Sequence, residues 1–385
     1  MGLNDYSGQG SAFVGPLNVH WQPKGYVTAT EWQQFCAPFV PLARFPRFVY
    51  TTADTLVVPV EAYNAMWGKL KKAKVTFTVT TVTQTDSAHM IASGSLLPDG
   101  VSERKMRRGL TIPVGKNVPL GTVLLPLSTV AAPCQLRLAV CVNGTQQNAW
   151  DFWVYPPQDG YTPEPLRSLA PTVGGGFAAT ISSHPLYVTD TLDHQALTLL
   201  AQGGNVLIEA AGKVTLGSDV KQTYLPVFWN TSWFKMRPPH TTGAYIDSSH
   251  PLFRHFPTDD WSNLNWWELL NRAQVMNMME LPADYQSPIQ PIDTWHVSRK
   301  LGMMVEANVL KGKLIITTMD LRSRLDQRHV ARQMRRALLA YMQSDDFRPA
   351  LNLQPETINH FFTLQAPPVN MFTNESPDEL KPKIH

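Results

Sequence analysis

The sequence predicts a chain with two complete domains, an antiparallel β-sandwich followed by an α/β domain. Two patterns carry this prediction. Residues 53–157 alternate apolar and polar side chains with period two and show no helical pattern, whereas residues 158–346 alternate helical and strand patterns. A chain of 385 residues with 43% hydrophobic residues is also long enough to bury two cores.

The composition excludes several classes of protein. No run of about 18 apolar residues occurs, so we expect no membrane association through a spanning helix. A net charge of +3 gives no overall electrostatic case for nucleic-acid binding. Three cysteines without CxxC spacing predict neither a zinc site nor a disulfide framework. We therefore expect no metal and no cofactor.

Residues 1–52 do not resemble the start of a self-contained domain. Thr28 followed by Glu31 predicts a helix N-terminus, with a short helix through Phe35 and Cys36. Prolines then interrupt regular structure at positions 38, 41 and 46. Too few apolar periodic segments are present to close a core, so we expect this segment to pack on something else.

The strands of the sandwich are short. Pro59 in the first of them indicates an edge or bulge position, because proline cannot donate to the ladder. About seven such strands in roughly 100 residues are typical of a sandwich of immunoglobulin-like size. The strand candidates are residues 55–60, 74–82, 90–93, 123–126, 135–142 and 149–154.

In the α/β region, a helix over 190–202 should end at Gly203-Gly204 and lead into a strand at 206–208. Strand patterns at 301–309 and 313–319 follow. Asp326 then predicts the cap of an amphipathic helix whose outer face carries arginines 328, 332, 335 and 336. We expect an open, mostly parallel sheet with an antiparallel addition. Residues 347–385 are proline-rich and predict a C-terminal arm.

An unusual concentration of aromatic, acidic and amide side chains lies between residues 228 and 267. Aromatic rings can cover the apolar face of a sugar while polar groups take its hydroxyls. The alternative, that these tryptophans pack the core, is the more common role and stays open. The histidines here lack metal-binding spacing. The residues selected for carbohydrate contact are Trp233, Asp260, Trp261, Asn263 and Trp266.

No catalytic constellation emerges from the residues themselves. The chain has neither a G-x-S-x-G elbow nor a phosphate-binding glycine loop, and no cysteine follows Cys141. Glu209, Glu268 and Glu306 have no convincing carboxylate partner for glycoside hydrolysis. A second polar cluster predicts salt bridges on a surface. It consists of Asp293, His296, Arg299 and Lys300.

Several motifs carry a family resemblance. The segment LNDYSGQGSAFVG at 3–15, with FCAP at 35–38 and VPL at 40–42, resembles the end of the catalytic barrel in glycoside hydrolase family 2 proteins. These are the β-galactosidase-like proteins of gut-type bacteria. The motifs VFWNT at 227–231, PHT at 239–241, WWELL at 266–270 and MDLRS at 319–323 resemble their C-terminal portion. The resemblance covers most of residues 3–345.

The resemblance implies a non-catalytic C-terminal region, because the family's catalytic glutamates lie on earlier barrel strands. Residues 1–52 would then be a remnant of the TIM-barrel end and a linker. Residues 53–157 would be the sandwich, and residues 158–346 a flavodoxin-like or class I amidotransferase-like domain without its catalytic cysteine. Tyr6 and Gln9 would line the sugar pocket of the complete enzyme, since loops after barrel strands carry the site.

The partners that this implies are the missing catalytic barrel, an oligosaccharide or glycoside, and further copies in a homo-oligomer. The resemblance is compatible with a periplasmic or a cytoplasmic location in a bacterium. The alternative is a stand-alone carbohydrate-binding or scaffolding protein.

Overall fold

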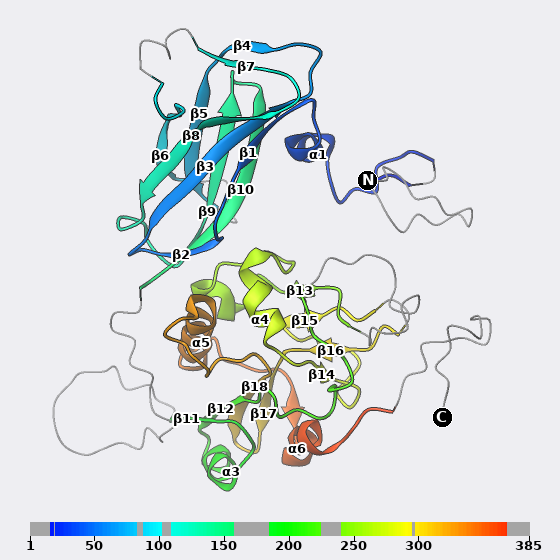
Figure 1. The fold of residues 1–385 in the computed structure, drawn as a ribbon. Helices are drawn as coiled ribbons and strands as arrows, with labels where there is room; N and C mark the ends of the chain where they lie inside the picture. Colours follow the sequence, from blue (N-terminus) through cyan, green and yellow to red (C-terminus); the bar gives the residue numbers. More distant parts are fainter. Residues whose placement is uncertain are drawn as a thin grey trace, which may run out of the picture. The chain divides into compact units, whose positions relative to one another are not determined.

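The chain forms a mixed, β-rich structure with several sheets and a few helices, as the coarse fold prediction required. The computed structural model describes residues 16–18, 20–82, 88–101, 109–157, 185–224, 240–294 and 297–367. These fall into two compact units, Met1–Val154 and Tyr155–His385 (Figure 1). Among the described residues, no helix is long and apolar enough to cross a membrane.

The first unit begins with helix α1 (Ala29–Phe35), where the sequence predicted it. Its N-terminus is closed by a reciprocal pair of hydrogen bonds. The Thr28 hydroxyl accepts from the Glu31 N–H at 3.2 Å, and the Glu31 carboxylate accepts from the Thr28 N–H at 2.7 Å. This capping box satisfies two helix-end donors. Helix α1 nevertheless buries none of its residues.

Two antiparallel sheets follow, as the period-two pattern indicated. One sheet has the strand order β1-β3-β8 and the other the order β2-β10-β9-β5-β6, while β4 and β7 form a separate pair. The strands are β1 (Phe39–Ala43), β2 (Val49–Thr51), β3 (Thr55–Asn64), β4 (Leu70–Ala73), β5 (Val75–Thr81), β6 (Met90–Ser95), β7 (Leu110–Ile112), β8 (Asn117–Pro126), β9 (Cys134–Val142) and β10 (Gln146–Tyr155).

Alternation along the strands places one face of each sheet in a common core. In β3, residues 56, 58, 60 and 62 are buried while residues 55, 57 and 59 between them are exposed. These side chains belong to the same apolar cluster as Leu136, Leu138 and Val140 of β9. Because successive strand residues point to opposite faces, the sequence alternation translates directly into this packing.

The structure corrects one detail of this unit. Strands β1 and β2 lie within residues 39–51, which the sequence placed outside the sandwich, and β1 pairs with β3 along its whole length. The bulge predicted at Pro59 is present, because the ladder between β3 and β8 shifts register beside it, and the β1 ladder begins only at Val60. The register shift lies between Val60 and Glu61, where Gly121 of β8 takes a φ of +125°.

The second unit contains the expected open sheet. Strands β11, β12 and β18 are parallel, β17 is antiparallel to β18, and β19 completes the edge. The helix between β11 and β12 is shorter than predicted, because Asp193 caps it by accepting from the Ala196 N–H. The elements are β11 (Leu186–Thr189), α3 (His194–Ala201), β12 (Asn205–Glu209), β17 (Met304–Val309), β18 (Gly312–Thr317), α5 (His329–Met342), β19 (Asn352–Leu353) and α6 (Pro355–Thr363).

A long excursion separates β12 from β17 and builds most of the candidate site. In it, β13 pairs with β15 and β14 with β16, each antiparallel. Its elements are β13 (Ala244–Ile246), η2 (Pro251–His255), η3 (Leu264–Trp266), α4 (Trp267–Asn271), β14 (Met276–Asn277), β15 (Ile289–Pro291) and β16 (Leu301–Gly302).

The predicted exposure of the α5 arginines is wrong for three of the four. Arg328, Arg332 and Arg335 are buried, because carboxylates and carbonyls from other elements satisfy their guanidinium groups. Arg335 donates to Glu209, the last residue of β12, at 2.7 Å. Arg328 pairs with Glu268 of α4, which lies 60 residues earlier in the chain.

Candidate functional site

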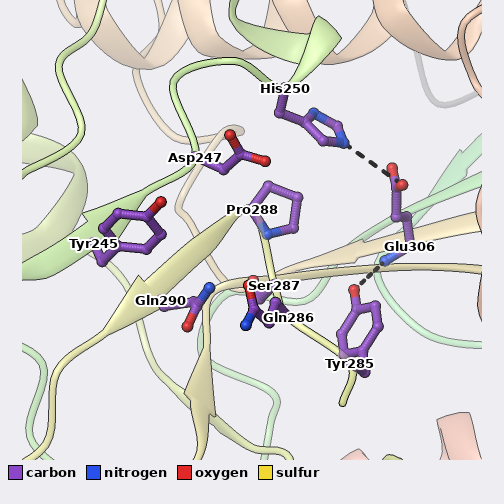
Figure 2. A pocket seen from close by; sticks show the side chains of 9 residues that line it. All are labelled: Tyr245, Asp247, His250, Tyr285, Gln286, Ser287, Pro288, Gln290 and Glu306. Atoms are coloured by element: carbon purple, nitrogen blue, oxygen red, sulfur yellow. Dashed lines mark hydrogen bonds and ion pairs between the residues drawn. The ribbon is translucent and has the colours of Figure 1, made fainter.

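A polar pocket of about 220 Å³ opens in the second unit. Three segments supply its walls: the end of β13 with the loop into η2, the loop into β15, and β17. Figure 2 shows their side chains arranged around the pocket. The lining residues are Tyr245, Asp247, His250, Tyr285, Gln286, Ser287, Pro288, Gln290 and Glu306.

One wall of the pocket is an ordered set of polar groups around Glu306. Tyr341 of α5 donates to its Oε2 at 2.8 Å. Figure 2 shows His250 facing the same carboxylate, with Nε2 3.6 Å from Oε1. His250 Nδ1 accepts from the Leu252 N–H, so Nε2 carries the proton of the neutral ring. Burial, followed by the neighbouring Glu306 carboxylate, raises the pKa of Tyr341 and keeps this phenol a donor.

Tyr285 supplies a hydroxyl to the same wall. Its oxygen accepts from the backbone N–H of Glu306 at 3.2 Å, which leaves its own proton available for a ligand. Burial raises the pKa of Tyr285, so the phenol stays protonated at neutral pH. Ser287, in contrast, is structural: its hydroxyl oxygen lies 2.6 Å from the Met304 carbonyl oxygen and 2.8 Å from that of Ile289.

An exposed aromatic residue adjoins the pocket. Trp261 is 60% exposed, forms a β-bridge with Tyr245, and meets the Tyr245 ring edge-on with centroids 5.5 Å apart. Asp260, the residue before it, accepts from Ser248, which follows the lining residue Asp247. Of the residues selected from sequence for carbohydrate contact, Asp260 and Trp261 therefore lie beside this pocket, although neither lines it.

Trp266 and Asn263 do not join them. Trp266 has no exposed surface, and its indole N–H donates to Thr258 at 2.8 Å, so it is a core residue and offers no face to a sugar. Asn263 caps η3 and donates to Asp259, which is a structural role. Tyr6, Gln9 and Trp233 lie outside the described residues.

The second predicted cluster does form salt bridges, although one of them is buried. Asp293 has a fully buried side chain and pairs with Arg299 at 2.8 Å. Arg299 also pairs with Asp219 at 2.5 Å. Lys300 donates to the carbonyls of residues 282 and 283, and His296 lies outside the described residues. This cluster is a structural ion-pair network.

Metal and thiol chemistry find no support among the described residues. No group of three or more His, Cys, Asp or Glu side chains there could hold a metal ion. The three cysteines are free, and burial raises the pKa of Cys134 to about 11. A thiol with such a pKa is a poor nucleophile at neutral pH.

Sequence reasoning missed most of the pocket. Glu306 was considered only as a candidate for a carboxylate pair, and Tyr245, Asp247 and Tyr285 were not selected. The close spacing of Tyr245, Asp247 and His250 was the one available signal. Their meeting with Tyr285 and Glu306 depends on pairing between β13 and β15, which no local pattern reveals.

Each of the two units matches one family model. Residues 187–363 match the family model for a domain of unknown function (DUF8487), and residues 54–156 match that for another domain of unknown function (DUF8488). Each match covers less than half of the chain. No curated protein sequence matches it.

Some solved structures are weakly similar. The sporulation control protein Spo0M from Bacillus subtilis is 13% identical with a TM-score of 0.22, over 31% of this chain and 50% of that chain. The DNA glycosylase AlkC from Pseudomonas fluorescens is 12% identical with a TM-score of 0.23, over 31% of this chain and 31% of that chain. A β-glucosidase from Listeria innocua is 14% identical with a TM-score of 0.22, over 30% of this chain and 16% of that chain. This chain thus spans half or less of these proteins, and at such TM-scores the likenesses carry no argument.

Proposed function

We propose that this chain is a non-catalytic C-terminal accessory region of a β-galactosidase-type glycoside hydrolase, and that its second unit contacts carbohydrate. The observation that carries the proposal is the pocket beside Trp261. Its walls present hydroxyl, carboxylate, amide and imidazole groups, and an exposed indole stands next to it. This combination of hydrogen-bonding groups and an aromatic surface suits a sugar.

Two features support the family assignment within this proposal. In this proposal, we interpret the two-sheet unit as an immunoglobulin-like sandwich. The open sheet is an amidotransferase-like domain that lacks its catalytic cysteine, since no cysteine follows Cys141. The motifs that resemble glycoside hydrolase family 2 proteins are the further support.

The accessory role is supported by the surface before the first sheet. Trp21 is 65% exposed, Phe35 at the end of α1 is 53% exposed, and α1 buries none of its residues. In the proposal, the catalytic barrel covers them.

No hydrolytic role is proposed for the pocket. Glu306 is oriented by Tyr341 and faces His250, so its carboxylate is held as a hydrogen-bond acceptor. We expect no glycosidase turnover above background from this chain, and clear turnover would contradict the accessory role.

The alternative function, a stand-alone carbohydrate-binding or scaffolding protein, shares the pocket but has no enzymatic parent. The reading frame upstream of residue 1 separates the two. A continuous frame that encodes a barrel supports the accessory region, whereas its absence supports the stand-alone protein.

Carbohydrate contact is tested by calorimetric titration of the full chain with a panel of methyl glycosides and short oligosaccharides. Trp261→Ala should weaken binding about fivefold, which corresponds to about 1 kcal/mol for a lost aromatic contact. Trp267→Ala is the matched control, because Trp267 is 55% exposed on α4 and has neither the β-bridge nor the ring contact that joins Trp261 to the lining residue Tyr245. Absence of binding to any sugar, or equal loss in both variants, would refute carbohydrate contact at this pocket.

A further inference from the structure

The charge of the pocket restricts the sugar it can take. Asp247 and Glu306 place two carboxylates in its walls. Among the described residues, no lysine or arginine lines it. The nearby Lys300 is engaged elsewhere: its ammonium donates to the carbonyls of Pro282 and Ala283, and it lies 5.9 Å from the centre of the Tyr285 ring.

The two carboxylates are fixed in position rather than free to turn away. The Asp247 Oδ1 accepts from both the N–H and the hydroxyl of Ser249, at 3.2 and 2.5 Å. Glu306 is held by Tyr341 at 2.8 Å. Fixed negative groups in a recess attract a cation and repel an anion without reorganisation when the ligand arrives.

The size of the pocket limits the ligand to a small unit. About 220 Å³ is below the range of roughly 300–1,000 Å³ that drug-sized ligands occupy. One monosaccharide unit is the appropriate size, and further units of a chain would extend toward Trp261, beside Tyr245.

We infer that the pocket takes a single glycosyl unit that carries no acidic group, and that it prefers an amino sugar with a free ammonium group over its neutral counterpart. The ammonium would lie near the carboxylates of Asp247 and Glu306, while the Tyr285 hydroxyl donates to a ring hydroxyl. This inference rests on the proposed carbohydrate contact and defines its ligand class.

Three probes that share one ring test the inference: glucosamine, glucose and glucuronate, each titrated into the full chain at low ionic strength. We expect glucosamine to bind about tenfold more tightly than glucose, and glucuronate about tenfold more weakly. Asp247→Asn should reduce the difference between glucosamine and glucose to about twofold. Asp345→Asn is the control, because Asp345 is an exposed residue outside the pocket, and it should leave the difference in affinity between glucosamine and glucose unchanged.

Because Asp247 also orders the Ser249 turn, Glu306→Gln provides a second variant. Its amide oxygen can still accept from Tyr341, so the wall is retained while one charge is lost. Equal affinities for the three probes, or tightest binding of glucuronate, would overturn the charge selection and leave carbohydrate contact standing. No binding of any probe or oligosaccharide to the folded protein would overturn both proposals.

Discussion

Removal of the Arg335 guanidinium should expose how strongly the second unit depends on one buried ion pair. Arg335 and Glu209 have side chains that are 8% and 1% exposed, and Arg335 Nε lies 2.7 Å from Glu209 Oε1. The next cation, Arg322 Nε, is 3.9 Å from the other carboxylate oxygen. Arg335→Met retains the aliphatic stem but leaves a buried carboxylate without its main partner.

The expected cost is about 3–5 kcal/mol, the usual penalty for removing one partner of a buried pair. This corresponds to a roughly 150-fold to 5,000-fold increase in the opening constant of the sheet. Hydrogen exchange of peptides from α5 and β12, measured in the full chain, reports this change in the opening constant. Arg254→Met is the matched control, because Arg254 is 61% exposed and its pair with Asp346 should contribute less than about 1 kcal/mol.

The pH dependence adds a second readout. Burial already raises the pKa of Glu209, and loss of Arg335 should raise it further. A raised folded-state pKa means that the penalty is small below the ordinary value of 4.5 and grows as the pH rises through the folded value. Glu209→Gln combined with Arg335→Met should recover part of the loss. A loss no greater than that of Arg254→Met, or no recovery in the double variant, would refute this reasoning.

Two further predictions concern a thiol and a carboxylate. At pH 8, iodoacetamide should modify the exposed Cys36 and leave Cys134 largely unmodified, because burial raises the pKa of Cys134 to about 11. Mass spectrometry of the labelled peptides distinguishes the two cysteines. Equal labelling of both would contradict the burial of Cys134. The hydrogen bond from Lys213 holds the pKa of Asp190 below its ordinary 3.8. The stability that Asp190 contributes should therefore be present above pH 3.8 and disappear as the pH falls through the folded value. Thermal unfolding from pH 3 to 7 should show the gap between the protein and Asp190→Asn closing on the acid side, and a constant gap would contradict the prediction.

Local signals in the sequence predicted local structure well. The Thr28 and Glu31 pair predicted the start of α1, and alternation predicted β3, β5, β6, β8, β9 and β10. One local prediction is wrong, because Arg328 and not Asp326 precedes the first residue of α5. The other failures depend on partners that are distant in the chain, such as the pairing of β1 with β3.

The buried arginines and the pocket were missed for the same physical reason. Arg335 meets a glutamate 126 residues earlier, so periodicity alone assigned it to solvent. The pocket is closed by segments near residues 245, 285 and 306, which only the sheet pairing brings together. Trp266 is an error of the opposite kind. Its aromatic neighbours in the sequence suggested a contact with a ligand, but its side chain is buried in the core.

The pairing of β1 with β3 determines where the chain can be shortened. A protein that started at residue 53 would keep every strand from β3 onward but lose Phe39–Ala43 from the side of β3. The amides and carbonyls of residues 60–64 that pair with β1 would then face solvent. Such an uncovered edge is a template for association with other chains, so a version trimmed there should aggregate while one that retains Phe39 stays dispersed.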